Sequence, residues 1–127
     1  MINIHIAVLP YNRGADPNFW SWFDQTPKGV TIHQITKGLD TGPIYAQSTL
    51  PLSNAHTLRT SYEVLMREAV ALFSWYWPAI REGKIKTTPQ TGKGSYHRRA
   101  DKEPYLRAHG TAGWDVSCAE VEEWGRR

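Results

Sequence analysis

The chain has 127 residues, of which 40% are hydrophobic, and its formal net charge at pH 7 is +3. This length suits a single domain, and this hydrophobic content excludes a chain that is disordered by composition. Cys118 is the one cysteine, which excludes an intrachain disulfide and a zinc site built from several cysteines. We expect a cytoplasmic protein that contacts no membrane, because a lone cysteine suits a reducing compartment, no apolar run approaches ~20 residues and no signal peptide is evident.

The first predicted element is a strand over residues 2–9, where apolar and polar side chains alternate. Its isoleucines share one face and Asn3 and His5 share the other, because successive side chains of a strand point to opposite faces. Pro10 ends this strand. Asn3 and His5 therefore lie near its carboxyl end, which is where ligands bind in open α/β sheets.

A loop and a short helix are predicted next. Residues 11–18 are rich in turn formers and indicate a loop. Residues 18–23 indicate a short helix, for which Asp16 is a candidate N-cap and Pro17 occupies the first position.

Two further strands are predicted over residues 29–36 and 44–50. The loop between them, residues 37–43, holds two glycines and a proline. A link this short favours antiparallel pairing of the two strands. His33 lies in the middle of the first of them among apolar residues, and we interpret it as structural.

The clearest helix is predicted over residues 57–82, where apolar residues recur at steps of three and four. Thr57 can cap its start, and Gly83 stands where a C-terminal cap belongs. The pattern then dissolves, so residues 84–104 are predicted to be loop with short extended pieces. Weak apolar spacing indicates a short helix over residues 114–127.

Three polar side chains of this arrangement can act together in acid–base chemistry. Asp40 lies in a loop flanked by glycines, which can hold a carboxylate at a fixed angle. An amide from Asn3 can donate to a developing oxyanion, and the imidazole of His5 can move protons near neutral pH. The carboxylate can orient the imidazole. These residue types are common, so the pattern alone leaves a purely structural role for them open.

Four segments, in this order, resemble the folate-dependent formyltransferases. They are NIHIAVLP at residues 3–10, Arg13 with Gly14, GVTIH at residues 29–33 and GLDTG at residues 38–42. That family includes methionyl-tRNA formyltransferase, glycinamide ribonucleotide transformylase and the sugar N-formyltransferases. Several motifs at familiar spacing are far more specific than any one of them.

The resemblance implies an α/β fold that is the C-terminal half of a formyltransferase-type Rossmann-like domain, with about three strands, one long helix and a loop-rich tail. Residues 1–83 would form the catalytic-core segment, and residues 84–127 a loop-rich extension of the same domain. The family normally carries a nucleotide-type α/β half before the catalytic strand. We therefore expect the first strand to have an unpaired edge and to promote self-association. A fragment of a longer protein and a shortened, inactive product remain open alternatives.

The resemblance also implies the chemistry. The co-substrate would be N10-formyltetrahydrofolate, with no metal, and a neutral amine of the acceptor would attack the formyl carbon. Asn3 and protonated His5 would stabilise the oxyanion, and Asp40 would hold His5. Gly38 and Leu39 are assigned with Asp40 to the binding of the folate.

A second set of residues is assigned to the acceptor: Pro10, Arg13, Gly14, Tyr96, His97 and Arg98. The last three belong to a segment that resembles the sugar-modifying branch of the family. The expected acceptor is therefore a small-molecule amine, an amino sugar attached to a nucleotide. A tRNA acceptor would need a further domain, for which the residues after the long helix are too few.

Two other readings of the sequence stay open. The chain could be a catalytically inactive remnant of the same fold that acts as an oligomerising module, which predicts no binding of folate. It could also be a basic domain that binds nucleic acid, which would need clustered Lys and Arg with aromatic platforms, but its basic run near residues 93–102 is short.

Overall fold

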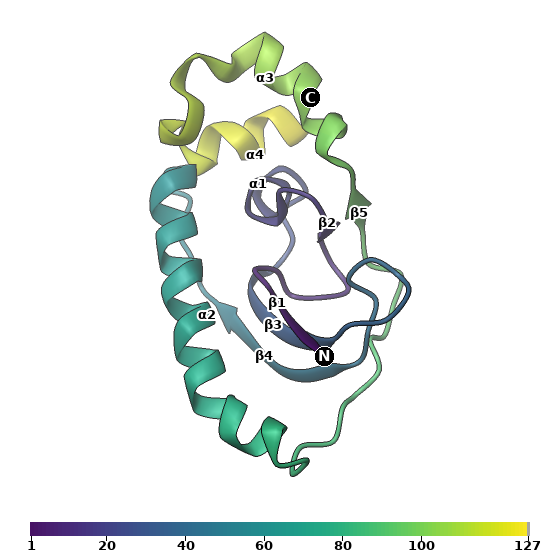
Figure 1. Cartoon of the computed structure of the whole chain (residues 1–127). Coiled ribbons are helices and arrows are strands. Elements are labelled where there is room, and N and C mark those ends of the chain that lie inside the picture. The colour runs from purple at the N-terminus through teal and green to yellow at the C-terminus, as the bar shows by residue number, and fades with distance from the viewer. Residues whose placement is uncertain (127) are drawn as a thin grey trace.

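The structure, a computed structural model, describes residues 1–126, with the side chains of residues 110 and 111 outside the description. Within this range the main sheet has three strands, β1 (Ile2–His5), β3 (Lys28–Gln34) and β4 (Ile44–Leu50). They pair antiparallel in the order β1-β3-β4 (Figure 1). The predicted pairing of the second and third strands is confirmed, and β1 lies at an edge of the described sheet.

The first strand is shorter than the alternation predicted, because it ends at His5 rather than at residue 9. Beyond His5, hydrogen bonds from a β3 side chain replace the backbone hydrogen bonds between β1 and β3. The Thr31 hydroxyl of β3 donates to the Ala7 carbonyl over 2.7 Å and accepts from the Leu9 amide over 3.3 Å. The chain thus stays close to β3 while it turns away from strand geometry.

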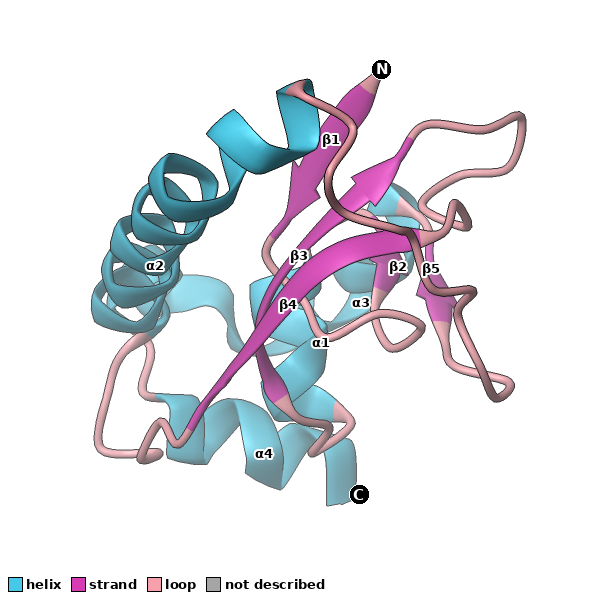
Figure 2. Cartoon of the chain, turned by 90° about the horizontal axis from the view of Figure 1, so that it is seen from below, coloured by secondary structure: helices cyan, strands magenta, loops and turns pink. Residues whose placement is uncertain are grey.

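One helix, α2 (Leu58–Arg81), lies along one side of the sheet (Figure 2). The Thr57 hydroxyl accepts from the Thr60 amide, and Gly83 follows the helix with a φ of +71°, so both predicted caps are confirmed. The helix and the sheet enclose one core, made of Val30, Ile32, Ala46, Leu65, Ala69, Leu72 and Ile80. Burial of each large aliphatic side chain there stabilises the fold by about 1.5–3 kcal/mol.

A second core joins two distant parts of the chain. α1 (Pro17–Phe23) packs against α4 (Cys118–Arg126), and their contact buries Phe19, Trp20, Trp22, Val116, Cys118, Val121 and Trp124. Asp16 precedes α1 as predicted, but its side chain makes no capping hydrogen bond. The residue has a left-handed φ of 51°, and its carboxylate instead accepts from Lys102 over 3.0 Å.

The segment after α2 is more ordered than the sequence predicts. β5 (Tyr96–His97) pairs in parallel with the short β2 (Arg13–Gly14), and η1 (Arg99–Lys102) and α3 (Glu103–His109) follow. α3 was not predicted from the sequence. η2 (Gly110–Asp115) leads to α4, which begins at Cys118 because Gly113 and Val116 have non-helical backbone angles. No helix within residues 1–126 combines the length and the apolarity needed to cross a membrane.

Candidate active site

The Asp40 carboxylate is buried in the tight loop between β3 and β4. Asp40 has a φ of 56°, in the left-handed region that residues with a Cβ atom rarely adopt. Gly42 in the same loop packs so closely that a Cβ atom would overlap the Gln34 carbonyl oxygen. The loop therefore turns tightly back on β3 and directs the carboxylate inward.

Three groups surround this carboxylate. The Gly14 amide donates to Oδ2 over 2.9 Å. His5 Nε2 lies 3.8 Å from Oδ2, and His33 Nε2 lies 3.6 Å from Oδ1, both beyond the length of a formed hydrogen bond. Burial raises the pKa of Asp40, but the approach of His33, the Gly14 amide and the nearby His5 together hold it below its ordinary value. Asp40 is therefore ionised at neutral pH.

His5, the last residue of β1, is held by a backbone carbonyl. Its Nε2 lies 2.7 Å from the Asn12 oxygen. Because a carbonyl oxygen only accepts, Nε2 must carry a hydrogen, and Nδ1 is then the nitrogen that gains or loses a proton. Asn12 is itself fixed, since its amide groups donate to Ser95 and Thr26 over 2.8 and 2.7 Å.

The structure brings His5 and Asp40 together, as predicted, and leaves Asn3 exposed on the same strand. Asn3 lies opposite His33 in the β1–β3 ladder. The interpretation of His33 as structural is therefore incomplete, because its ring approaches Asp40 more closely than that of His5 does. The antiparallel register, which pairs His33 with Asn3, was the signal that could have identified it.

Some of the side chains assigned to the acceptor are exposed to solvent, and others are bound to neighbouring side chains of the protein. Tyr96 is 53% exposed, and its strand β5 runs beside Arg13 and Gly14. The His97 ring stacks on Trp20 at 3.7 Å between centroids and bonds the Asp24 carboxylate over 2.9 Å. The guanidinium of Arg98 pairs with a carboxylate three residues later, and that of Arg13 donates to a glutamine side chain. Tyr96 and the Arg98 side chain, which is 72% exposed, are therefore the members of this set most open to a ligand.

The loop assigned to the folate exposes one large apolar side chain beside the buried carboxylate. Leu39 is 57% exposed, next to buried Asp40. Gly38 packs against Thr41 so closely that a Cβ atom would overlap the threonine hydroxyl. Within residues 1–126, no group of three His, Cys, Asp or Glu side chains is arranged to hold a metal ion.

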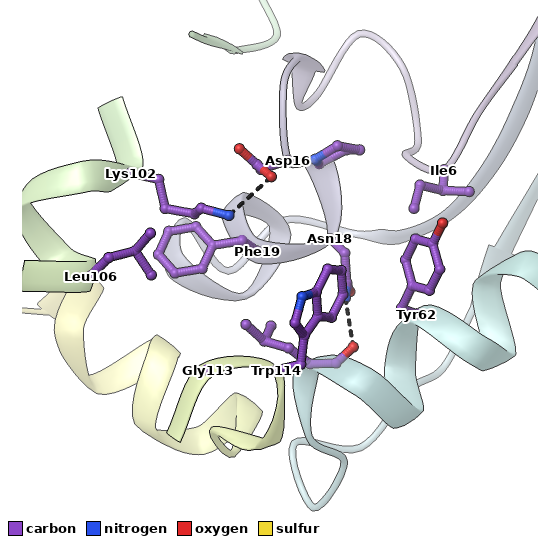
Figure 3. Close-up of a pocket in the computed structure, with 11 residues that line it drawn as sticks. Ile6, Asp16, Asn18, Phe19, Tyr62, Lys102, Leu106, Gly113 and Trp114 are labelled. Carbon is purple, nitrogen blue, oxygen red and sulfur yellow. Dashed lines mark hydrogen bonds and ion pairs between the residues drawn. The ribbon is translucent and has the colours of Figure 1, made fainter. Parts of the chain in front are cut away.

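A cavity of about 460 Å³ lies between α1, the start of α2 and the segment around Trp114 (Figure 3). Two of its lining residues are close in sequence to residues of the site, since Ile6 follows His5 and Asp16 lies two residues after Gly14. An ion pair of Asp16 with Lys102 and a hydrogen bond from Asn18 to the Leu58 carbonyl lie in its wall. The remaining lining is largely apolar and comes from Ile6, Pro17, Phe19, Leu58, Tyr62, Leu106, Gly113 and Trp114.

Residues 1–74 match the family model described as formyl transferase. A dTDP-4-amino-4,6-dideoxyglucose formyltransferase of Mycobacterium tuberculosis is 33% identical over 106 residues, which cover 84% of this chain and 45% of that protein. A methionyl-tRNA formyltransferase of Thermodesulfovibrio yellowstonii is 31% identical over 121 residues, which cover 94% of this chain and 38% of that protein. The chain thus spans less than half the length of these curated relatives.

A solved structure resembles nearly the whole chain. The formyltransferase PseJ from Anoxybacillus kamchatkensis, in complex with UDP-4,6-dideoxy-4-formamido-L-AltNAc and tetrahydrofolate, superimposes with a TM-score of 0.92 at 49% sequence identity. The match covers 98% of this chain and 65% of that one. It confirms the predicted α/β fold class.

Proposed function

Because the chain belongs to the formyl transferase family, we propose that it carries the catalytic part of an N-formyltransferase, with N10-formyltetrahydrofolate as the formyl donor. The observation that carries the proposal is the buried, ionised Asp40 between His5 and His33, hydrogen-bonded by the Gly14 amide. The tetrahydrofolate and the formamido sugar nucleotide bound to the related PseJ support the choice of substrates.

The residues of the site fit a folate donor, because the exposed Leu39 side chain lies next to a carboxylate and an imidazole that can handle protons. When bound, N10-formyltetrahydrofolate supplies a formyl group that an amine can accept. The Asp40 carboxylate lies 3.8 Å from Nε2 of His5, and Nδ1 of that ring is the nitrogen that can hold a proton or release it. The exposed Asn3 amide can donate to negative charge that develops on the formyl oxygen.

A direct test compares formyl transfer by the native chain with transfer by His5→Ala and Asp40→Ala. We expect each substitution to lower kcat/KM by about a hundredfold or more. The matched control is His56→Ala, which removes a histidine whose ring contacts Thr60 at the start of α2, outside the site. Turnover near that of the native chain in both site variants would exclude the assigned roles.

For the acceptor we propose an amino sugar attached to a nucleotide. A relative that is a formyltransferase of a dTDP-linked amino sugar and the UDP-linked formamido sugar bound to PseJ support this class. The cavity between α1, Tyr62 and Trp114 offers aromatic walls suited to a flat ring. Trp114 is 52% exposed and contacts Tyr62 edge-on at 5.4 Å between centroids. Base stacking on such a ring contributes about 1–3 kcal/mol.

Two substitutions test this choice of acceptor. Trp114→Ala should raise KM for a nucleotide-linked amino sugar about fivefold or more and leave KM for the folate unchanged. Trp75→Ala serves as the matched control, since it removes an indole that is 80% exposed on α2 and does not line the cavity. Equal KM values in the two variants would remove the cavity from the proposed acceptor site.

The edge strand supports a second proposal, that two copies associate through β1. Beside this edge lies a groove of about 230 Å³ with a wholly apolar lining, made by Ile4, Ile6, Met66, Ala69, Val70 and Phe73. A second copy would cover both the groove and the unpaired backbone of β1 by a two-fold pairing. Light scattering measures the mass, and a monomer at working concentration contradicts the pairing. A dimer that binds no folate would instead favour the oligomerising module over the enzyme.

A further inference from the structure

Gln90 joins two loops of the candidate site, although it lies far from both in the sequence. It belongs to the connection between α2 and β5, which in Figure 1 passes the β3–β4 loop. Its side-chain Nε2 donates to the Asp40 and Gly42 carbonyl oxygens, each over 2.8 Å. Its Oε1 accepts from Arg13, over 3.2 Å from Nε and 2.7 Å from Nη2.

These four contacts use the full capacity of the carboxamide. An amide nitrogen has two hydrogens to donate and an amide oxygen has two lone pairs. The carbonyl oxygens can only accept and the Arg13 guanidinium can only donate, so the two ends of the Gln90 amide cannot exchange places. No other neutral side chain of this length offers both functions.

The Asp40 loop needs such a support. A residue with a Cβ atom at a φ of 56° is held in a conformation that costs about 1–2 kcal/mol, and such residues persist where the surroundings fix them. Gln90 fixes the carbonyl of Asp40 and that of the second residue after it. Through Arg13 it also fixes the segment whose next residue, Gly14, donates to the Asp40 carboxylate.

From this geometry we propose that Gln90 is a positioning residue, which ties the Arg13 loop to the Asp40 loop and so keeps the Gly14 amide on the Asp40 carboxylate. The proposal rests on the proposed function, because it assigns Gln90 a part in the same site. Gln90 acts through Asp40 and does not itself meet a substrate.

The first test needs no enzymatic activity. The groups that face the Asp40 carboxylate are the Gly14 amide, His5 and His33. In the native chain the NMR signal of the Gly14 amide should follow the ionisation of this carboxylate. In Gln90→Met, which keeps the length of the side chain and removes its hydrogen bonds, that response should weaken and the pKa of Asp40 should rise, because the amide donor that lowers it has moved.

Gln90→Glu separates the two halves of the link. It keeps an acceptor for Arg13 but turns an oxygen toward the carbonyls of the Asp40 loop, so it should also weaken the Gly14 response. The matched control is Gln34→Met, at an exposed position near the same loop, which should retain the native titration. A native Gly14 titration in both Gln90 variants overturns the proposal. So does a Gln90→Met chain that fails to fold, because Gln90 would then support the fold as a whole.

The second test uses formyl transfer. In Gln90→Met the Asp40 carboxylate should be displaced, and this displacement should lower kcat about tenfold or more. The acid limb of the pH profile should shift to higher pH, and KM for the folate should stay nearly unchanged. A change in KM alone would contradict a positioning role. If the native chain transfers no formyl group, the proposed function fails, and the NMR test still decides whether Gln90 positions Asp40.

Discussion

The histidine contacts of two carboxylates, Asp24 and Asp40, differ in ways that distance alone would misjudge. His97 and Asp24 approach to 2.9 Å, with side chains that are 21% and 30% exposed. His5 and His33 stay 3.8 and 3.6 Å from Asp40, with side chains that are at most 10% exposed. The shorter contact lies where water screens it, and the longer ones are buried, where charges interact more strongly.

The surroundings of the two carboxylates point to different roles. Asp40 lies between two imidazoles and accepts from a backbone amide, and these groups together hold the pKa of its carboxyl below the ordinary value. Asp24 ends α1, and its histidine partner lies flat on Trp20. The first arrangement can move protons, whereas the second fixes β5 against α1.

The largest effect is expected when the charge of Asp40 is removed and the result is compared with removal of the charge of Asp24. Asp40→Asn removes the buried negative charge beside His5, so kcat/KM for formyl transfer should fall about a thousandfold. Asp24→Asn should leave kcat/KM within about threefold of native, because exposed ion pairs contribute little. Steady-state kinetics of both variants, with thermal unfolding as a check of the fold, provide the measurement. Comparable losses in the two variants would show that burial does not separate their roles.

His33 provides the second, smaller test. His33→Leu removes the imidazole that helps to lower the pKa of Asp40, so this pKa should rise. A carboxyl whose folded pKa is depressed adds stability above its unfolded pKa, and this stability is lost as the pH falls through the folded pKa. In the variant, Asp40 should therefore contribute less to stability at neutral pH, and the loss on acidification should begin at a higher pH.

Urea unfolding of native and His33→Leu chains from neutral to acid pH measures this change. His97→Leu is the matched control, since its partner carboxylate is more exposed. The two variants should differ in the pH at which stability declines. An unchanged pH dependence of stability in His33→Leu would mean that His33, 3.6 Å from Asp40, does not affect the pKa of that carboxyl.

The parts that were predictable from sequence are those with a local cause. Alternation located β1, and a short glycine-containing loop indicated the antiparallel pairing of β3 with β4. Thr57 and Gly83 marked the ends of α2. The resemblance to formyltransferases directed attention to His5 and Asp40, which the structure places in contact.

The parts that were not predictable depend on contacts between distant residues. Gln90 donates a hydrogen bond to the Asp40 carbonyl, 50 positions earlier in the sequence, and no local pattern indicates such a contact for a glutamine in a loop. His97 was predicted to contact the acceptor, but in the structure its ring bonds the Asp24 carboxylate, 73 positions earlier in the sequence. Asp16 is a residue type that often caps a helix, but its carboxylate accepts a hydrogen bond from Lys102, which is 86 positions later in the sequence.

The smallest expected effect concerns the exposed pair, and it separates the two contacts that His97 makes. His97→Phe keeps a flat ring 3.7 Å from Trp20 and removes the bond to Asp24. The free energy of unfolding should fall by less than about 1 kcal/mol, as for other exposed ion pairs. His97→Ala also removes the stacked ring and should cost about 0.5–1.5 kcal/mol more. Urea unfolding distinguishes the two, and a larger loss in His97→Phe than in His97→Ala would mean that the carboxylate, rather than the indole, holds β5 in place.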